Sequence, residues 1–157
     1  IIRYPRGKGI LVDWHNEMQH IETGKGEMLI EGKEIAIVGV GPLLYQAQKA
    51  IERADKELGI NAGLYDLRFA KPIDEELLKA IADKYDNIIT IEDGTIIGGI
   101  GSAIEDWLLD KGYKGKKVYK MGLPDAFIEH GTQPELYRML EIDSEGIFQK
   151  IKNINIQ

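Results

Sequence analysis

The feature that most constrains the fold of this 157-residue chain is a repeated alternation of apolar strand segments with amphipathic helical segments. Glu34–Val40 is almost wholly apolar after its first residue, as expected for a strand that is covered on both faces. After Gly41 and Pro42, apolar residues recur at helical spacing as far as Leu58, and Gly59 ends the pattern. We therefore predict a buried strand that leads directly into a helix.

The same unit recurs further along the chain. Ala62–Leu67 predicts a second strand, and Asp74 is placed to cap the helix that follows. Asn87–Ile91 and Lys117–Met121 predict two more strands, separated by a glycine-rich loop over 92–102 and another helix. The remaining expected elements are a short strand within 25–33 and helices at about 134–140 and 144–154. This alternation predicts a three-layer α/β/α domain with a mostly parallel sheet.

Length and composition narrow the class of protein. A chain of 157 residues has the size of one domain, so we expect residues 1–157 to form a single domain. The net charge of −6 argues against nucleic acid or an anionic membrane as the main partner. The absence of cysteine excludes a disulfide framework, a thiolate nucleophile and a cysteine-ligated metal. No apolar run approaches the roughly 20 residues of a membrane-spanning helix.

The pattern of the first residues is the one expected of a segment inside a longer polypeptide. The sequence starts without methionine, and an apolar pair runs directly into two arginines around a Tyr-Pro step. We expect residues 1–20 to be a linker from a preceding domain, and the chain to be a C-terminal fragment that works jointly with residues upstream of it.

Two glycine-rich turns are candidates for binding a nucleotide or another anion. Gly39-Val40-Gly41 lacks the third glycine of a dinucleotide loop, because Leu44 stands there, and Pro42 has no amide hydrogen to offer a phosphate. The turn over 98–102 precedes a helix N-terminus, where an anion could dock, but it lacks the lysine of a P-loop. We favour close strand-to-helix packing for both turns, with a nucleotide-binding module as the alternative.

The remaining polar residues do not form a complete active site. None of His15, His20 and His130 has metal-ligand spacing, although His130 follows the fourth strand, a suitable place for a site or interface residue. Glu92 and Asp93 are adjacent, so a strand directs them to opposite sides, which suits them poorly for acid–base catalysis. The residues alone therefore predict no catalytic, cofactor-binding or metal-binding set.

Three arginines are the cations of greatest interest, namely Arg3, Arg6 and Arg68. Arg6 lies between a proline and a glycine, and its planar guanidinium group could bind a phosphate through two parallel hydrogen bonds. An ion pair with one of the 26 carboxylates is the equally supported alternative.

Five motifs that occur in a fixed order give more information about the function than the single residues do. They are Arg3-Tyr4-Pro5-Arg6-Gly7, Gly24-Lys25-Gly26-Glu27, Arg68-Phe69-Ala70-Lys71-Pro72-Ile73-Asp74-Glu75, Gly98-Gly99-Ile100-Gly101-Ser102-Ala103 and Gly122-Leu123-Pro124-Asp125-Ala126-Phe127-Ile128-Glu129-His130-Gly131. Each motif is weak alone, but the ordered set resembles the C-terminal domain of the 1-deoxy-D-xylulose-5-phosphate synthase family over essentially the whole chain. The segment 122–131 best separates this family from its transketolase relatives.

The resemblance implies a fold and an activity. It implies the transketolase C-terminal fold, a five-stranded sheet with one antiparallel edge strand. Complete enzymes of the family are cytoplasmic homodimers that condense pyruvate with glyceraldehyde 3-phosphate and release carbon dioxide. They use thiamine diphosphate and Mg²⁺, and their product feeds isoprenoid, thiamine and pyridoxal synthesis. Because the two upstream domains bind these cofactors, the resemblance implies that this chain binds neither and is inactive alone.

The resemblance assigns one residue a role. The second arginine of the first motif helps to hold the phosphate of glyceraldehyde 3-phosphate, and here that residue is Arg6. Arg3, Tyr4 and His130 are accessory candidates. Glu92-Asp93-Gly94 departs from the Glu-Glu-Asn that is common in the family. The alternatives are the C-terminal domain of a transketolase or of a 2-oxo-acid dehydrogenase beta subunit, or a non-catalytic module for dimer assembly.

Overall fold

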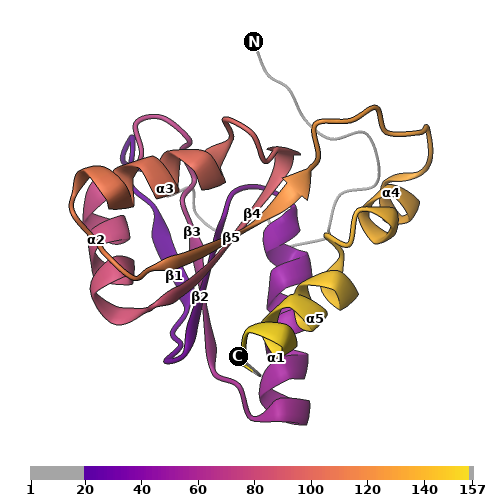
Figure 1. The fold of residues 1–157 in the computed structure, drawn as a ribbon, viewed down its shortest axis with the longest axis horizontal. Coiled ribbons are helices and arrows are strands. Elements are labelled where there is room, and N and C mark those ends of the chain that lie inside the picture. The colour runs from indigo at the N-terminus through magenta and orange to yellow at the C-terminus, as the bar shows by residue number, and fades with distance from the viewer. Residues whose placement is uncertain (1–19, 156–157) are drawn as a thin grey trace.

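The computed structural model describes residues 20–155 and contains the predicted alternation of strands and helices (Figure 1). The elements of this part of the chain are β1 (Glu27–Ile30), β2 (Ile35–Gly39), α1 (Leu43–Leu58), β3 (Ala62–Asp66), α2 (Glu75–Lys84), β4 (Asn87–Thr95), α3 (Ile100–Asp110), β5 (Lys117–Leu123), α4 (Gln133–Met139) and α5 (Ser144–Asn155). Every element that the sequence predicts is present, with bounds that differ by a few residues.

The five strands form one mixed sheet in the order β1-β3-β2-β4-β5. β2 runs parallel to both β3 and β4, and β5 runs parallel to β4, whereas β1 pairs antiparallel with β3 at one edge. The predicted five-stranded, mostly parallel sheet with one antiparallel edge strand is therefore confirmed. The chain moves from β2 to β3 on one side and then crosses to β4 on the other, which makes the carboxyl ends of β2 and β4 a topological switch point.

Helices cover both faces of the sheet (Figure 1). Ile35 and Ile37 of β2 pack into the apolar cluster that contains residues of α1 and α5. Ala36 and Val38, which point to the other face, belong to the cluster that contains residues of α2 and α3. Because β2 is buried on both faces, its sequence is continuously apolar rather than alternating. The predicted three-layer arrangement is confirmed.

The carboxyl ends of β4 and β5 extend beyond the rest of the sheet. The last pair between β2 and β4 is Gly39 with Ile91, yet β4 continues to Thr95, which pairs with Leu123 of β5 after a shift in register. The sequence predicts that β4 ends at Ile91, because Glu92-Asp93-Gly94 has low strand propensity. Backbone pairing with β5 overrides that preference. We refer to Glu92–Thr95 and Gly122–Leu123 together as the β4–β5 extension.

Candidate functional site at the carboxyl end of the sheet

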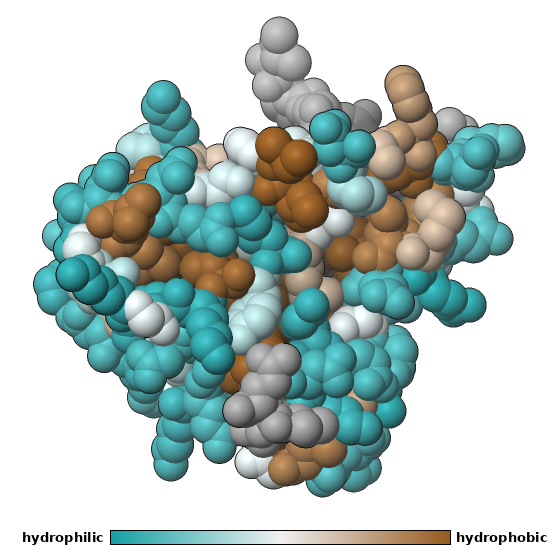
Figure 2. Space-filling view, viewed as in Figure 1, coloured by the Kyte–Doolittle hydropathy of each residue, from teal (hydrophilic) through white to brown (hydrophobic). Residues whose placement is uncertain are grey.

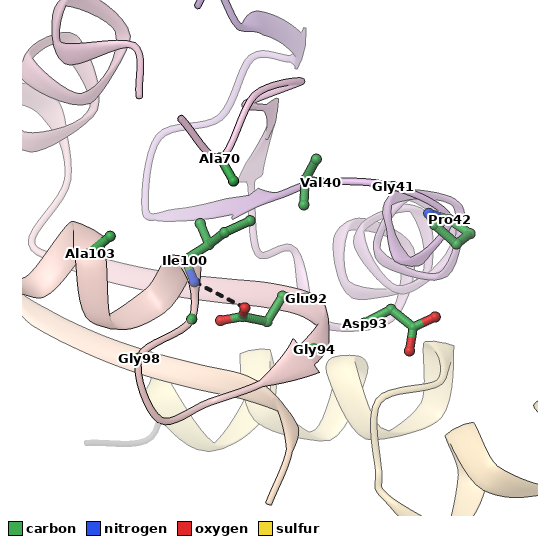
Figure 3. Close-up of a pocket in the computed structure, with 11 residues that line it drawn as sticks. Val40, Gly41, Pro42, Ala70, Glu92, Asp93, Gly94, Gly98, Ile100 and Ala103 are labelled. Carbon is green, nitrogen blue, oxygen red and sulfur yellow. Dashed lines mark hydrogen bonds between the residues drawn. The ribbon is translucent and has the colours of Figure 1, made fainter. Parts of the chain in front are cut away.

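A pocket of about 650 Å³ lies at the switch point between β2 and β4 (Figure 3). Its walls come from the β2–α1 turn, from the segment after β3, and from the end of β4 with the loop and first turn of α3. The lining residues are Val40, Gly41, Pro42, Ala70, Glu92, Asp93, Gly94, Gly98, Gly99, Ile100 and Ala103. In open α/β domains this crevice is the usual place for a ligand.

Glu92 is the buried polar residue of this pocket, with 6% of its surface exposed. Its Oε2 accepts a hydrogen bond from the Ile100 amide at 2.9 Å (Figure 3). Its Oε1 accepts one from the Gly101 amide at 3.0 Å. These amides belong to the first turn of α3, where unpaired N–H groups and the helix dipole favour a negative charge. The chain's own carboxylate therefore holds the position that an external anion would take at this helix.

Close packing accounts for glycines in both candidate turns. A β-carbon at Gly99 would overlap the Glu92 carboxylate, and one at Gly39 would overlap Ile91 on the neighbouring strand. Close packing is therefore observed in both turns, between strand and helix at Gly99 and between neighbouring strands at Gly39. Sequence reasoning missed the capping role of Glu92, because a carboxylate eight residues before a helical amide follows no local spacing rule.

Asp93 points away from Glu92, toward α4 (Figure 3). Its Oδ2 accepts a hydrogen bond from the Tyr137 hydroxyl at 2.9 Å, and Gln133 Nε2 donates to the same hydroxyl at 2.9 Å. Burial, together with this carboxylate, raises the pKa of Tyr137 above its usual value. The prediction that Glu92 and Asp93 point to opposite sides is confirmed.

The pocket does not suit a phosphorylated ligand. None of its lining residues is cationic, and both of its charged residues are carboxylates. Among residues 20–155, no group of three or more His, Cys, Asp or Glu side chains could hold a metal ion. The residues present here therefore do not fit the diphosphate and Mg²⁺ of the cofactor that the resemblance implies, and the nucleotide-binding alternative loses its supporting geometry.

Of the predicted substrate-binding and accessory residues, the structure describes His130 alone. Arg3, Tyr4 and Arg6 lie outside the described residues, as does nearly all of the predicted linker. His130 is described, and it is exposed in the loop between β5 and α4. The third arginine, Arg68, follows β3 with a positive φ of 56° and forms an ion pair with Glu27. An ion pair, the alternative considered for Arg6, is thus what the structure shows for Arg68.

The described helices carry no membrane span. None of them combines the length and the apolar character that crossing a bilayer requires.

Comparison with known proteins identifies similar sequences along nearly the whole chain. The family described as "Transketolase, C-terminal domain" matches residues 24–147. The 1-deoxy-D-xylulose-5-phosphate synthase of Phocaeicola vulgatus is 48% identical over 95% of this chain and 23% of its own length. The synthase of Parabacteroides distasonis is 48% identical over 99% of this chain and 24% of its own length. The chain thus spans about a quarter of the curated relatives that it matches.

Solved structures agree with these sequence matches. A chain described as "Split gene transketolase, inactive beta4 tetramer" superimposes with a TM-score of 0.78 and 32% identity, covering 86% of this chain and 43% of that one. A transketolase from Pichia stipitis, 23% identical, shares the fold with a TM-score of 0.60 over 83% of this chain and 18% of its own. The homology is to the C-terminal region of the synthases. The chain belongs to the transketolase C-terminal domain family.

Proposed function

We propose that this chain is the C-terminal domain of a 1-deoxy-D-xylulose-5-phosphate synthase, which condenses pyruvate with glyceraldehyde 3-phosphate and releases carbon dioxide. The observation that carries the proposal is the identity of 44–48% with synthases from four Bacteroides-type relatives over 95–99% of this chain. An identity of this size, spread over a whole domain, favours the same parent enzyme rather than a shared fold alone.

The roles proposed for the two parts of the polypeptide rest on the described pocket and on the resemblance to the synthases. The pocket at the switch point offers no cationic side chain to a diphosphate, and this supports the proposal that the preceding part of the polypeptide binds the thiamine diphosphate and Mg²⁺ of the synthase. The chain contributes a packed C-terminal domain and, through Arg6, a guanidinium group for the phosphate of glyceraldehyde 3-phosphate. Arg3, Tyr4 and His130 are proposed as accessory residues. The complete enzyme is proposed to act in the cytoplasm as a homodimer.

The test is an assay of the complete polypeptide that carries this domain. Purified with thiamine diphosphate and Mg²⁺, it is expected to form 1-deoxy-D-xylulose 5-phosphate and release carbon dioxide only when both pyruvate and glyceraldehyde 3-phosphate are present. A folded, cofactor-loaded polypeptide that leaves both substrates unchanged would contradict the proposal.

Transketolase activity is the second candidate, supported by the 32% identity to the split-gene transketolase chain. A transketolase would transfer a two-carbon unit from a ketose phosphate and would not release carbon dioxide from pyruvate. Offering the same preparation a ketose phosphate in place of pyruvate therefore separates the two activities.

A further inference from the structure

The loops that follow β4 and β5 carry large apolar side chains into solvent. Ile97, after β4, is 63% exposed, and Phe127, after β5, is fully exposed. Figure 2 shows apolar side chains gathered in the upper part of the molecule, where β4 and β5 end in Figure 1. Isolated exposed apolar residues are ordinary on protein surfaces, whereas neighbouring ones indicate a contact surface.

Both loops start from the β4–β5 extension, which holds them next to each other. The Ile96 amide donates to the Leu123 carbonyl at 3.0 Å, so the first residue after β4 is bonded to the last residue of β5. Since this extension reaches beyond β2, it presents both loops outside the body of the sheet.

The loop that contains Ile97 is held in place by its own hydrogen bonds. The Ile97 amide donates to Thr95 Oγ1 at 3.3 Å, and the Ser102 hydroxyl donates to the Ile96 carbonyl at 3.0 Å. The same hydroxyl accepts from the Gly98 amide at 3.2 Å. An apolar side chain on a turn that is already ordered loses little conformational entropy on docking.

The loop that contains Phe127 is anchored at both ends. It follows the Leu123 contact, and it ends where Thr132 and Glu135 form a capping box at the start of α4. Asp125 and Glu129 flank Phe127 and are exposed, and no ion pair within residues 20–155 involves either of them. A complementary surface would offer an apolar pocket for the aromatic ring, with lysine or arginine at its border.

We propose that residues 95–98 and 124–131, together called the apolar rim, dock on the preceding part of the synthase polypeptide. This inference rests on the proposed function. The curated relatives contain about four times the length of this chain, and that additional sequence is the polypeptide to which this domain would be tethered. A tethered partner reaches the rim surface at high effective concentration.

Hydrogen exchange on the complete polypeptide tests the docking. Three forms are compared: the unchanged protein, Phe127→Asp, and the matched control Leu109→Asp. Leu109 is also an exposed apolar residue, at 77%, but it lies at the end of α3 that is remote from the rim. Phe127→Asp is expected to accelerate exchange of the amides of residues 95–98 and 125–131 at least tenfold, while Leu109→Asp leaves them protected. Because both side chains are exposed, neither change disturbs the core.

Two results would overturn the proposal. One is equally fast exchange of the rim in the unchanged protein and in Phe127→Asp. The other is protection that disappears when the polypeptide is diluted, because that would make a second copy the partner. The synthase assay on the same preparation separates this proposal from the one on which it rests. Concentration-independent protection in a polypeptide that forms no product would support the docking and contradict the synthase assignment.

Discussion

Single residues of β4 show how differently a buried polar group can be accommodated. The carboxylate of Glu92 accepts hydrogen bonds from two amides of α3. The Thr90 hydroxyl, two residues earlier on the same face of the strand, has no hydrogen-bond partner within the described residues. A buried polar group left unpaired costs about 1–3 kcal/mol. These two positions therefore offer opposite expectations for substitutions that change shape very little.

Glu92→Gln is expected to lower the free energy of unfolding by about 1–3 kcal/mol, because the new amide NH₂ must face an N–H donor of α3. Thr90→Val is the matched control. It removes an unpaired hydroxyl with almost no change in volume, so the free energy of unfolding should stay the same or rise by up to about 1 kcal/mol. Urea denaturation measures both variants, and equal losses would contradict the capping role of Glu92.

A substitution of Arg6 tests the role that we propose for this residue in substrate binding. In the complete enzyme, Arg6→Ala is expected to raise KM for glyceraldehyde 3-phosphate about ten- to a hundredfold, while KM for pyruvate changes far less. Loss of a hydrogen bond to a charged group costs about 1.5–3 kcal/mol, which corresponds to that factor. Steady-state kinetics with each substrate varied in turn measures the effect.

Lys8→Ala, which removes a cation two residues away, is the control for Arg6. It is expected to leave KM for glyceraldehyde 3-phosphate nearly unchanged. An unchanged KM in Arg6→Ala, or equal increases in both variants, would refute a specific phosphate contact.

At the scale of secondary-structure elements, Asp74 joins the start of α2 to the segment that enters β1. Its Oδ1 accepts hydrogen bonds from the Glu76 and Leu77 amides at 3.1 and 3.0 Å, and its Oδ2 accepts one from the Gly26 amide at 2.9 Å. Burial alone would raise the pKa of the Asp74 carboxyl group. The three amide donors and the nearby charge of Lys25 outweigh burial and hold that pKa below its usual value.

Asp74→Asn is expected to destabilise the protein by about 1–3 kcal/mol at pH 7, because the amide cannot accept all three hydrogen bonds. The folded-state pKa of Asp74 is lowered, so its stabilisation is complete above the unfolded-state pKa of about 4 and is lost as the pH falls through the folded-state value. The difference between variant and unchanged protein should therefore shrink below about pH 4. Denaturation series at several pH values measure it. The exposed residue Asp106 of α3 provides the control Asp106→Asn, for which a comparable loss would contradict the role of the cap.

The elements were predictable wherever local sequence and burial agree. β2 is continuously apolar and buried on both faces, and Asp74 caps α2 as its position indicates. The β4–β5 extension was not predictable, since Glu92–Thr95 becomes a strand only through pairing with β5, a segment far along the chain. The site was predictable only in part. Adjacent carboxylates on a strand were expected to diverge, but their partners were not, because the α3 amides lie eight and nine residues after Glu92, at no recognised capping distance, and Tyr137 lies 44 residues after Asp93.

At the scale of the whole molecule, helices cover both faces of the sheet. One apolar cluster joins α1 and α5 to the sheet, and a second joins α2 and α3 to the opposite face. A domain with its own core on each face of a five-stranded sheet has the usual requirements for independent folding.

The 157-residue chain by itself is therefore expected to unfold in one cooperative transition and yet to bind no thiamine diphosphate in the presence of Mg²⁺. We expect the chain to fold because it has a buried apolar cluster on each face of the sheet. We expect no binding because the charged residues that line the switch-point pocket are both carboxylates. Thermal denaturation followed by circular dichroism checks the first expectation, and titration calorimetry checks the second. The complete polypeptide, titrated in the same buffer, is the positive control, because it would contain the cofactor-binding part. Heat of binding from the isolated chain would contradict the proposal that the preceding part of the polypeptide, and not this domain, binds thiamine diphosphate.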